Sequence, residues 1–306
     1  MLCLATQVGA AAPLAFVTNQ SANTVSVIDL ATRATVRTIG VGQAPAGIAF
    51  DRQRRYAFVT APAEHAVTVI DVAEQTVVNT IKFGGEVLGI AANPVRDRVY
   101  VADWYRNRVW VIDTLRLSIV GELATGNIPS GLAVSPDGAR LLVANRDDNT
   151  LSIFDLDTNT APKIIGVGRA PFGVTIAHDG ARGYVANVKS NDISVVDLKQ
   201  MRKVATIAVG EAPYAIADDT RGRLFVTNQQ GGTVSVIDLG AAHEIKQIPI
   251  GEYPEGIAYS RTLNRMYVAS WFDNTLTGIN LDTLQREAPI ACGDGPRAFG
   301  EFITEP

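Results

Sequence analysis

The sequence contains few of the residues that bind transition metals or form disulfides. Its 306 residues include two cysteines and three histidines. No CxxC, HExxH or CxxCH motif occurs, which argues against structural zinc, a zinc-protease site and covalently attached haem. Acidic and basic side chains nearly balance. The net charge of −4 therefore gives the surface as a whole no electrostatic reason to bind nucleic acid.

Long hydrophobic runs are also missing. No segment reaches the roughly 20 apolar residues of a membrane-spanning helix, so we expect no membrane span. Residues 1–12 carry no charge and pass from apolar to small side chains, with an acceptable cleavage site at residues 8–10. We predict that residues 1–12 are the remnant of a signal peptide, that residues 13–306 form one domain, and that the protein is periplasmic or extracellular. A frayed cytoplasmic N-terminus is the alternative, because no basic region precedes the apolar stretch.

An internal repeat of about 42 residues runs through the chain. One phrase, typically aromatic-Val-Thr/Ala-Asn, starts at Phe16, Phe58, Tyr100, Leu142, Tyr184, Phe225 and Tyr267. A second, rich in β-branched residues, ends at Asp29, Asp71, Asp113, Asp155, Asp197, Asp238 and Asn280. A third, mostly Gly-x-x-Pro, starts at Gly42, Gly84, Gly126, Gly168, Gly210, Gly251 and Gly293. Three phrases in one register indicate one structural unit for each repeat.

Each unit holds four short β-branched or aromatic runs, separated by Gly, Pro, Asn and Asp. Four antiparallel strands in each period of about forty residues are typical of a propeller blade. The chain begins at the second strand of its first unit, and the last Gly-x-x-Pro phrase lies near the C-terminus. We therefore predict an all-β, seven-bladed β-propeller of four-stranded antiparallel blades. Residues 296–303 should supply the missing inner strand of blade 1 and close the ring, which removes exposed sheet edges.

Two further repeat positions have structural interpretations. Every copy of the position shortly after the third phrase is small: Gly47, Gly89, Gly131, Gly173, Ala215, Gly256 and Ala298. We predict that inner strands crowd together there, and not that a phosphate-binding loop is present, because no GxGxxG opens a helix. The aspartates that end the second phrase are expected to be turn residues, since an Asx turn suits the end of a strand.

The phrases at residues 16–19 and 225–228, both Phe-Val-Thr-Asn, and the Tyr-Val-Ala-Asn variant at residues 184–187 resemble the YVTN repeat of bacterial and archaeal propellers. The resemblance covers residues 14–303 and implies an exported propeller. Such relatives include surface-layer proteins, propellers accompanying quinone-dependent alcohol oxidation and, more distantly, the heavy chain of methylamine dehydrogenase. Other related propellers are lyases or lactonases. The resemblance makes a periplasmic redox enzyme a candidate partner, but the site must decide the chemistry.

The mouth of the channel is the expected place for a ligand, because loops from all blades converge there. The loops at residues 103–108 and 270–275 each carry two consecutive aromatics, and several loop prolines are followed by large or charged residues. The predicted ligand-binding residues are Asp103, Trp104, Tyr105, Arg146, Phe172, Tyr214, Glu255, Trp271, Phe272 and Arg297. Aromatic walls with a few charges suit a small-molecule pocket. The alternative is that the two tryptophans cap their own blades.

Metal binding and catalysis have weaker support in the sequence. His65, Asp103 and Glu255 are weak candidates for a metal site, because zinc prefers several His or Cys ligands and only a hard cation suits carboxylates. No GxSxG motif occurs, and His65 with Glu255 is the pairing that a lyase could use as a general base. We predict no catalytic residue and no resident cofactor, with a bound metal ion left open.

These observations predict an exported, monomeric binding or scaffold protein without catalytic activity. Its channel mouth would bind a small molecule, a metal ion or a partner protein, and we expect no nucleic-acid partner. The alternative is a propeller enzyme, lyase-like or lactonase-like, with its site at the same mouth.

Overall fold

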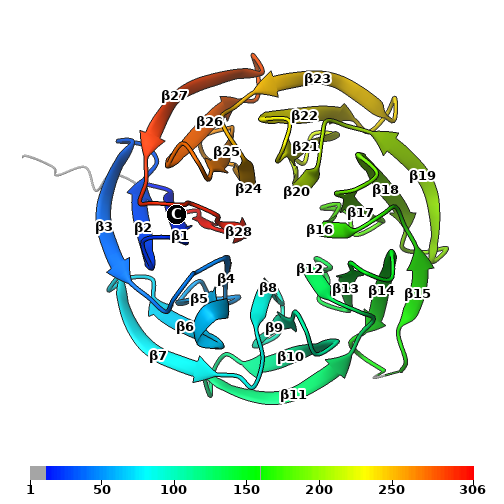
Figure 1. Ribbon diagram of the computed structural model, residues 1–306, viewed down its shortest axis with the longest axis horizontal. Helices are drawn as coiled ribbons and strands as arrows, with labels where there is room; N and C mark the ends of the chain where they lie inside the picture. The colour runs from blue at the N-terminus through cyan, green and yellow to red at the C-terminus, as the bar shows by residue number, and fades with distance from the viewer. Residues whose placement is uncertain (1–11, 159) are drawn as a thin grey trace, which may run out of the picture.

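Each repeat folds into one antiparallel sheet, and seven such sheets stand in a ring around a central axis (Figure 1). The computed structural model describes residues 12–158 and 160–306. Blade 1 combines β1–β3 with the C-terminal β29, and blades 2 to 7 follow in chain order, each beginning at its innermost strand. The predicted all-β, seven-bladed propeller is confirmed. The signal-peptide prediction falls mainly on residues 1–11, which lie outside the described residues.

The strands occupy four positions within a blade. The innermost strands are β4 (Gly47–Phe50), β8 (Val87–Ala92), β12 (Pro129–Val134), β16 (Pro171–Ile176), β20 (Pro213–Asp218) and β24 (Pro254–Ser260), together with the short β28 (Phe299–Gly300) and β29 (Ile303–Thr304). The second strands are β1 (Leu14–Asn19), β5 (Tyr56–Ala61), β9 (Arg98–Asp103), β13 (Arg140–Asn145), β17 (Arg182–Asn187), β21 (Arg223–Asn228) and β25 (Arg265–Ser270). The third strands are β2 (Thr24–Asp29), β6 (Ala66–Asp71), β10 (Arg108–Asp113), β14 (Thr150–Asp155), β18 (Asp192–Asp197), β22 (Thr233–Asp238) and β26 (Thr275–Asn280). The outer strands are β3 (Ala34–Gly40), β7 (Thr76–Lys82), β11 (Ser118–Ala124), β15 (Lys163–Gly166), β19 (Arg202–Ala208), β23 (His243–Pro249) and β27 (Gln285–Ala291).

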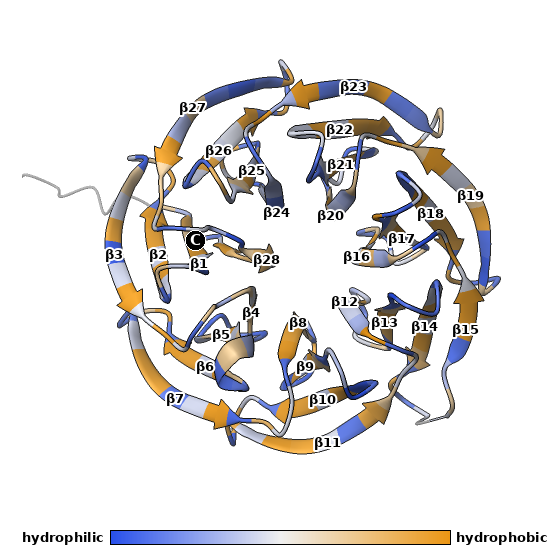
Figure 2. Cartoon of the chain, in the orientation of Figure 1, coloured by the Kyte–Doolittle hydropathy of each residue, from blue (hydrophilic) through white to orange (hydrophobic). Residues whose placement is uncertain are grey.

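Hydrophobic burial is concentrated in the second and third strands. In β5 and β6 nearly every residue is buried, because both faces of a blade pack against its neighbours. The outer strand β7 exposes most of its residues and buries Ile81. Figure 2 shows the same trend, with polar segments frequent on the outer strands. A single-turn 3₁₀ helix, η1 (Pro62–Glu64), lies in blade 2, and no helix in the described part of the chain is long and apolar enough to cross a membrane.

The innermost strands approach one another very closely near the axis. A Cβ atom on Gly89 would overlap the backbone carbonyl of Ser130 in the next blade, and a Cβ on Gly131 would overlap that of Phe172. The predicted crowding at this repeat position is therefore confirmed. Hydroxyl groups also join blades here, because Thr60 Oγ1 donates to the Leu88 carbonyl at 2.9 Å.

The C-terminal segment closes the ring, but not as one continuous strand. The Arg297 N–H donates to the Thr18 carbonyl and the Phe16 N–H to the Phe302 carbonyl, both at 2.8 Å, before β29 pairs antiparallel with β1. Between these contacts β28 leaves blade 1 and pairs in parallel with β4 of blade 2. Gly300 permits this detour because its φ of 117° is strained for other residues. Closure by the C-terminus is confirmed, with an interrupted strand.

Removal of residues 294–306 should unfold or aggregate the protein, because β1 would become an unpaired edge. The milder change Phe302→Ala removes a fully buried ring from the core of blade 1 and should lower the free energy of unfolding by about 3–5 kcal/mol. Urea unfolding followed by circular dichroism measures both effects. A truncated protein that melts at the wild-type temperature would contradict this account of closure.

Aspartate side chains cap the turns between third and outer strands. Asp113 Oδ1 accepts the N–H groups of Leu115 at 3.0 Å and Arg116 at 2.9 Å. The same pattern occurs at Asp29, Asp71, Asp155, Asp197 and Asn280. The prediction that these residues form turns is confirmed.

The cap at Asp113 should contribute a recognisable pH dependence. The Arg116 N–H holds the pKa of Asp113 below its usual value, with the Leu115 N–H and the Arg98 charge acting in the same direction against burial. Its contribution to stability is therefore present above the unfolded-state pKa, near 4, and is lost as pH falls through the lower folded-state pKa. Asp113→Asn keeps the acceptor oxygen, so its unfolding free energy should depend less on pH below about 4 than that of the wild type. Urea titrations at several pH values test this, and exposed Glu252→Gln should retain the wild-type slope.

Candidate functional site

Two positions of the repeat meet at one end of the central channel. The first is the residue directly after each second strand. The second is the residue that follows the loop proline. In blade 3 Val87 replaces this proline, and Leu88 is the residue meant. A β-bulge interrupts the pairing of the innermost strand at this position. Both positions lie on the face that also carries the loops from second to third strands, which we call the top face. Six of the seven blades thus contribute side chains to one place.

A cavity of about 500 Å³ occupies the top-face mouth of the channel. The first repeat position contributes Gln20, Trp104, Arg146, Val188, Gln229 and Trp271. The second contributes Leu88, Phe172, Tyr214, Glu255 and Arg297, and Tyr253 and Phe272 complete the lining. We call this space the top cavity. Its size and mixed aromatic and polar lining suit a small organic molecule.

One wall of the top cavity is a stack of aromatic rings. The rings of Phe172 and Tyr214 are stacked with centroids 4.2 Å apart, and the Trp104 ring lies 5.9 Å from Phe172. The Phe299 ring of β28 packs against both, at 5.1 Å from Phe172 and 5.5 Å from Tyr214. Arg146 lies 6.0 Å over the Trp104 ring, within the range of a cation–π interaction.

A second aromatic group comes from blade 7. Trp271 and Phe272 follow β25 and lie 4.7 Å apart, and Tyr253 packs against both, at 6.0 and 5.2 Å. Phe272 is 60% exposed although it lines the cavity. Aromatic rings that gather at a cavity rim are typical of a binding surface.

A buried charged network lies beside the first aromatic group and includes Tyr214. Arg297 Nε donates to Glu255 Oε2 at 2.5 Å, and Arg297 Nη2 donates to the Tyr214 hydroxyl at 2.5 Å. Gln229 Nε2 donates to Glu255 Oε1 at 2.9 Å. Glu255 is only 3% exposed, so its charge must be balanced inside the protein. These four residues come from blades 6 and 7 and from the C-terminal segment, whose closure of the ring positions Arg297.

Burial sets the protonation states in this network. Burial raises the pKa of Glu255, while Arg297 and the Gln229 hydrogen bond oppose that shift. Burial alone would lower the pKa of Arg297, but Glu255 and Tyr214 together outweigh burial, and the pKa lies above its usual value. Burial also raises the pKa of Tyr214. At neutral pH Arg297 is therefore a cation and Tyr214 a neutral phenol.

Eight of the ten predicted ligand-binding residues line the top cavity, and Asp103 and Tyr105 do not. The other blades show why Asp103 does not line the cavity. At the equivalent position most of them have asparagine. Asn145 Nδ2, for example, donates to the hydroxyls of Thr150 at 3.0 Å and Ser152 at 2.8 Å. The side chain at this position therefore ties the second strand to the third.

Blade 3 keeps the same side-chain connection between second and third strands, but donor and acceptor are exchanged. The two partner positions are Arg108 and Trp110, which are donors, so an acceptor is required at position 103. Asp103 accepts from Trp110 Nε1 at 3.2 Å, lies 3.9 Å from Arg108 Nε and is fully buried. Tyr105 is 64% exposed and packs edge-on against Trp104. Asp103 therefore has a structural role, and Tyr105 lies outside the cavity.

The three candidate metal ligands are not brought together. Asp103 is held by Trp110 inside blade 3, Glu255 by Arg297, and His65 is an exposed residue that ends η1. Within residues 12–158 and 160–306 no three His, Cys, Asp or Glu side chains form a group that could hold a metal ion. The pairing of His65 with Glu255 as a general base has no geometric support either, because His65 does not line the top cavity.

Five residues that line the top cavity were not predicted from the sequence: Gln20, Leu88, Val188, Gln229 and Tyr253. Four of them occupy the same two repeat positions as the predicted residues, which is the signal that the sequence contains for them. Their side chains are neither aromatic nor charged, so nothing else in the sequence marks these four residues. Gln229 matters most, since it completes the bonding of Glu255.

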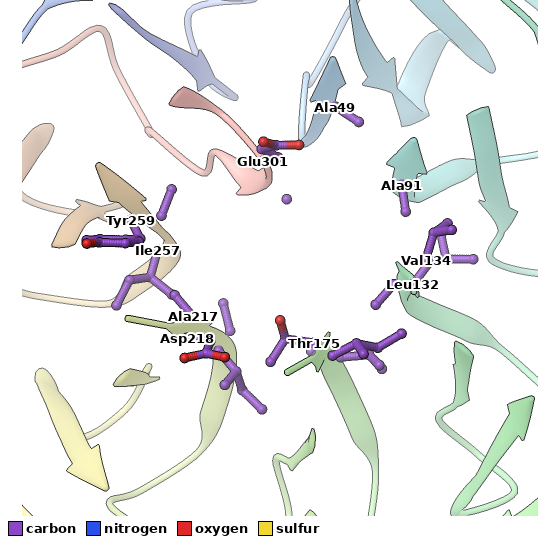
Figure 3. A pocket seen from close by; sticks show the side chains of 18 of the residues that line it. Ala49, Ala91, Leu132, Val134, Thr175, Ala217, Asp218, Ile257, Tyr259 and Glu301 are labelled. Carbon is purple, nitrogen blue, oxygen red and sulfur yellow. The ribbon is translucent and has the colours of Figure 1, made fainter. Parts of the chain in front are cut away.

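A second cavity of about 410 Å³ lies at the opposite end of the channel (Figure 3). Small residues of the innermost strands, such as Ala49, Ala91 and Ala217, line it, together with Phe299. At its rim, His178 Nδ1 lies 3.2 Å from Asp218 Oδ2. Because Phe299 packs against two rings that line the top cavity, an aromatic layer separates the two cavities.

The fold and the top cavity define a seven-bladed propeller with a small-molecule-sized pocket at its channel mouth. The sequence profile of the family described as "Lactonase, 7-bladed beta-propeller" matches residues 28–200, more than half of the chain, and the chain belongs to this family. No curated protein sequence matches the chain significantly.

Solved structures share the fold at low sequence identity. Hydrazine synthase from Kuenenia stuttgartiensis has a TM-score of 0.80 and 20% identity over 92% of this chain and 99% of that chain. A functionally unknown protein from Desulfotomaculum acetoxidans has a TM-score of 0.81 and 15% identity over 94% and 99%. Dihydro-heme d1 dehydrogenase NirN, in complex with DHE, has a TM-score of 0.69 and 15% identity over 95% and 74%. Identities this low show the shared fold alone.

The buried pair of Arg297 and Glu255 should show strong energetic coupling. Arg297→Met would leave Glu255 buried without its cationic partner and should cost about 3–5 kcal/mol of unfolding free energy. Adding Glu255→Gln removes the second charge, so the double variant should be more stable than the Arg297→Met protein. Urea unfolding of the four proteins in this cycle gives the coupling directly. Simple additivity of the two changes would show that the ion pair contributes nothing.

Proposed function

We propose that the protein binds a small, ring-containing molecule in the top cavity. The observation that carries the proposal is the convergence of two aromatic groups and a buried charged network on one cavity of about 500 Å³. Aromatic faces attract planar rings by stacking, and a few polar groups fix their orientation. The proposal includes export from the cytoplasm, which the uncharged, signal-peptide-like residues 1–12 support.

Hydrolysis of a lactone is the second candidate, and membership of the lactonase family favours it. In such a reaction the oxygen of water adds to the lactone carbonyl carbon, the ring C–O bond breaks, and a proton reaches the leaving oxygen to give a hydroxy acid. Arg297 and Tyr214 are placed to stabilise the negative carbonyl oxygen. A base to activate water is less evident, because both oxygens of Glu255 already accept hydrogen bonds. Binding is therefore the function that the geometry supports best.

Tryptophan fluorescence tests the binding proposal. A ring compound bound in the top cavity should quench Trp104 and Trp271, and Ala at either position should weaken binding by about tenfold to a hundredfold, because a stacked aromatic ring is lost. Trp110 provides the internal control, since it is held by Asp103 and does not line the cavity. The fluorescence of the Trp104→Ala/Trp271→Ala protein should therefore not respond to ligand.

A screen of cyclic compounds, lactones included, supplies the ligands, and a pH-stat assay on the lactones detects acid release. Acid release that Tyr214→Phe abolishes would establish the enzymatic candidate. Quenching without turnover supports a binding protein. Losses of stability at both tryptophans with unchanged ligand affinity would instead assign them to blade-top packing.

A further inference from the structure

Arg297 and Tyr214 line the top cavity, and each has a hydrogen-bond donor without an acceptor among the described residues, as does Trp271 Nε1. Arg297 uses Nε for Glu255 and one N–H of Nη2 for Tyr214. Its Nη1 group has no acceptor within hydrogen-bond distance among the described residues, although Arg297 lines the cavity. A guanidinium has five N–H donors, so most of its capacity remains for a ligand.

Tyr214 supplies the second donor. Its oxygen accepts from Arg297, which occupies a lone pair and leaves the phenolic hydrogen free. Burial raises the pKa of Tyr214, so this hydrogen stays on the oxygen at neutral pH. The described part of the chain offers it no acceptor. The stacking on Phe172 fixes the ring, and hence the position of the hydroxyl in the cavity.

Glu255 is not available to accept a hydrogen bond from a ligand. Both of its oxygens accept protein hydrogen bonds, one from Arg297 and one from Gln229, and it is almost completely buried. It balances the charge of Arg297 and fixes the plane of the guanidinium. Gln229 retains its carbonyl oxygen, which can accept from a ligand hydroxyl beside the main polar group.

We propose that the top cavity selects molecules with a carbonyl or carboxylate oxygen, which accepts hydrogen bonds from Arg297 Nη1 and the Tyr214 hydroxyl while the ring of the same molecule stacks on the aromatic walls. This inference rests on the proposed function. That function requires a ring in the ligand, and the inference adds the polar group that the same ligand carries. Charge acts in the same direction. The described lining residues include two guanidinium groups, those of Arg146 and Arg297, and one carboxylate, that of Glu255, which favours an anion over a cation although Arg146 is also paired with exposed Asp147.

Three probes that share one ring distinguish ring binding from recognition of a ligand oxygen: benzoate, methyl benzoate and benzylamine. Their dissociation constants for the full chain can be measured by ligand-observed NMR. We expect benzoate and methyl benzoate to bind at least about tenfold more tightly than benzylamine, because one charge-assisted or neutral hydrogen bond of this kind is worth roughly that ratio. Benzylamine binding as tightly as benzoate would overturn the oxygen proposal and leave the ring-binding function standing. Failure of all three probes would overturn both.

Tyr214→Phe tests the donor itself. This change keeps the ring that stacks on Phe172 and removes only the hydroxyl, so benzoate affinity should fall about fivefold to tenfold while benzylamine affinity stays unchanged. Tyr259→Phe is the matched control, since Tyr259 lines the opposite cavity and should leave benzoate affinity unaltered. Unchanged benzoate affinity in a folded Tyr214→Phe protein would contradict the proposal. If Tyr214→Phe melts early, Arg297→Lys replaces it, because Lys keeps the charge and lacks Nη1.

Discussion

The close approach of neighbouring innermost strands near the axis is the constraint on which the rest of the structure depends. At Gly131 and Gly173 not even a methyl group has room, since a Cβ there would overlap the next blade's backbone. The contact lies against the carbonyl of the residue that precedes the next small residue, such as Phe172 or Tyr214. This close contact between innermost strands therefore fixes the backbone of residues that line the top cavity. Packing and site geometry are consequences of the same contact.

The C-terminal segment has more than one task. Its backbone closes blade 1 through β29, yet its side chains serve the channel. Arg297 enters the charged network of the top cavity, Phe299 joins the aromatic layer, and Glu301 lines the opposite cavity and pairs with Arg54. The interruption of the closing strand at β28 follows from this double role, because a regular strand would alternate its side chains between the two faces of the blade. Closure of the ring and assembly of the site are therefore one event.

The buried network gives the cavity a polarity that the aromatic walls alone would not. Removing Arg297, Glu255 and Tyr214 from water is costly, and mutual hydrogen bonds offset that cost only if the geometry is held rigidly. The propeller supplies that rigidity, since Tyr214 and Glu255 stand at the starts of β20 and β24, and the Arg297 backbone N–H is held by the Thr18 carbonyl. A cavity built in this way is preorganised, so little ordering is left for a ligand to impose.

The sequence by itself determined the fold, because the repeat is local. A period of about 42 residues, turn residues such as Asp113, and small residues such as Gly131 specify each blade through neighbours close in the chain. It also marked the mouth of the channel, through Trp104, Trp271 and the residues after the loop prolines. Tertiary structure alone decided what those residues do. Asp103 looked like a ligand-binding carboxylate and instead satisfies Trp110, whereas Gln229 looked ordinary and completes the network around Glu255. Asp103 and Trp110 belong to one blade, whereas Gln229 and Glu255 belong to neighbouring blades. In both cases, whether a buried polar group faces a ligand or a protein partner depends on which donors and acceptors the folded strands place beside it.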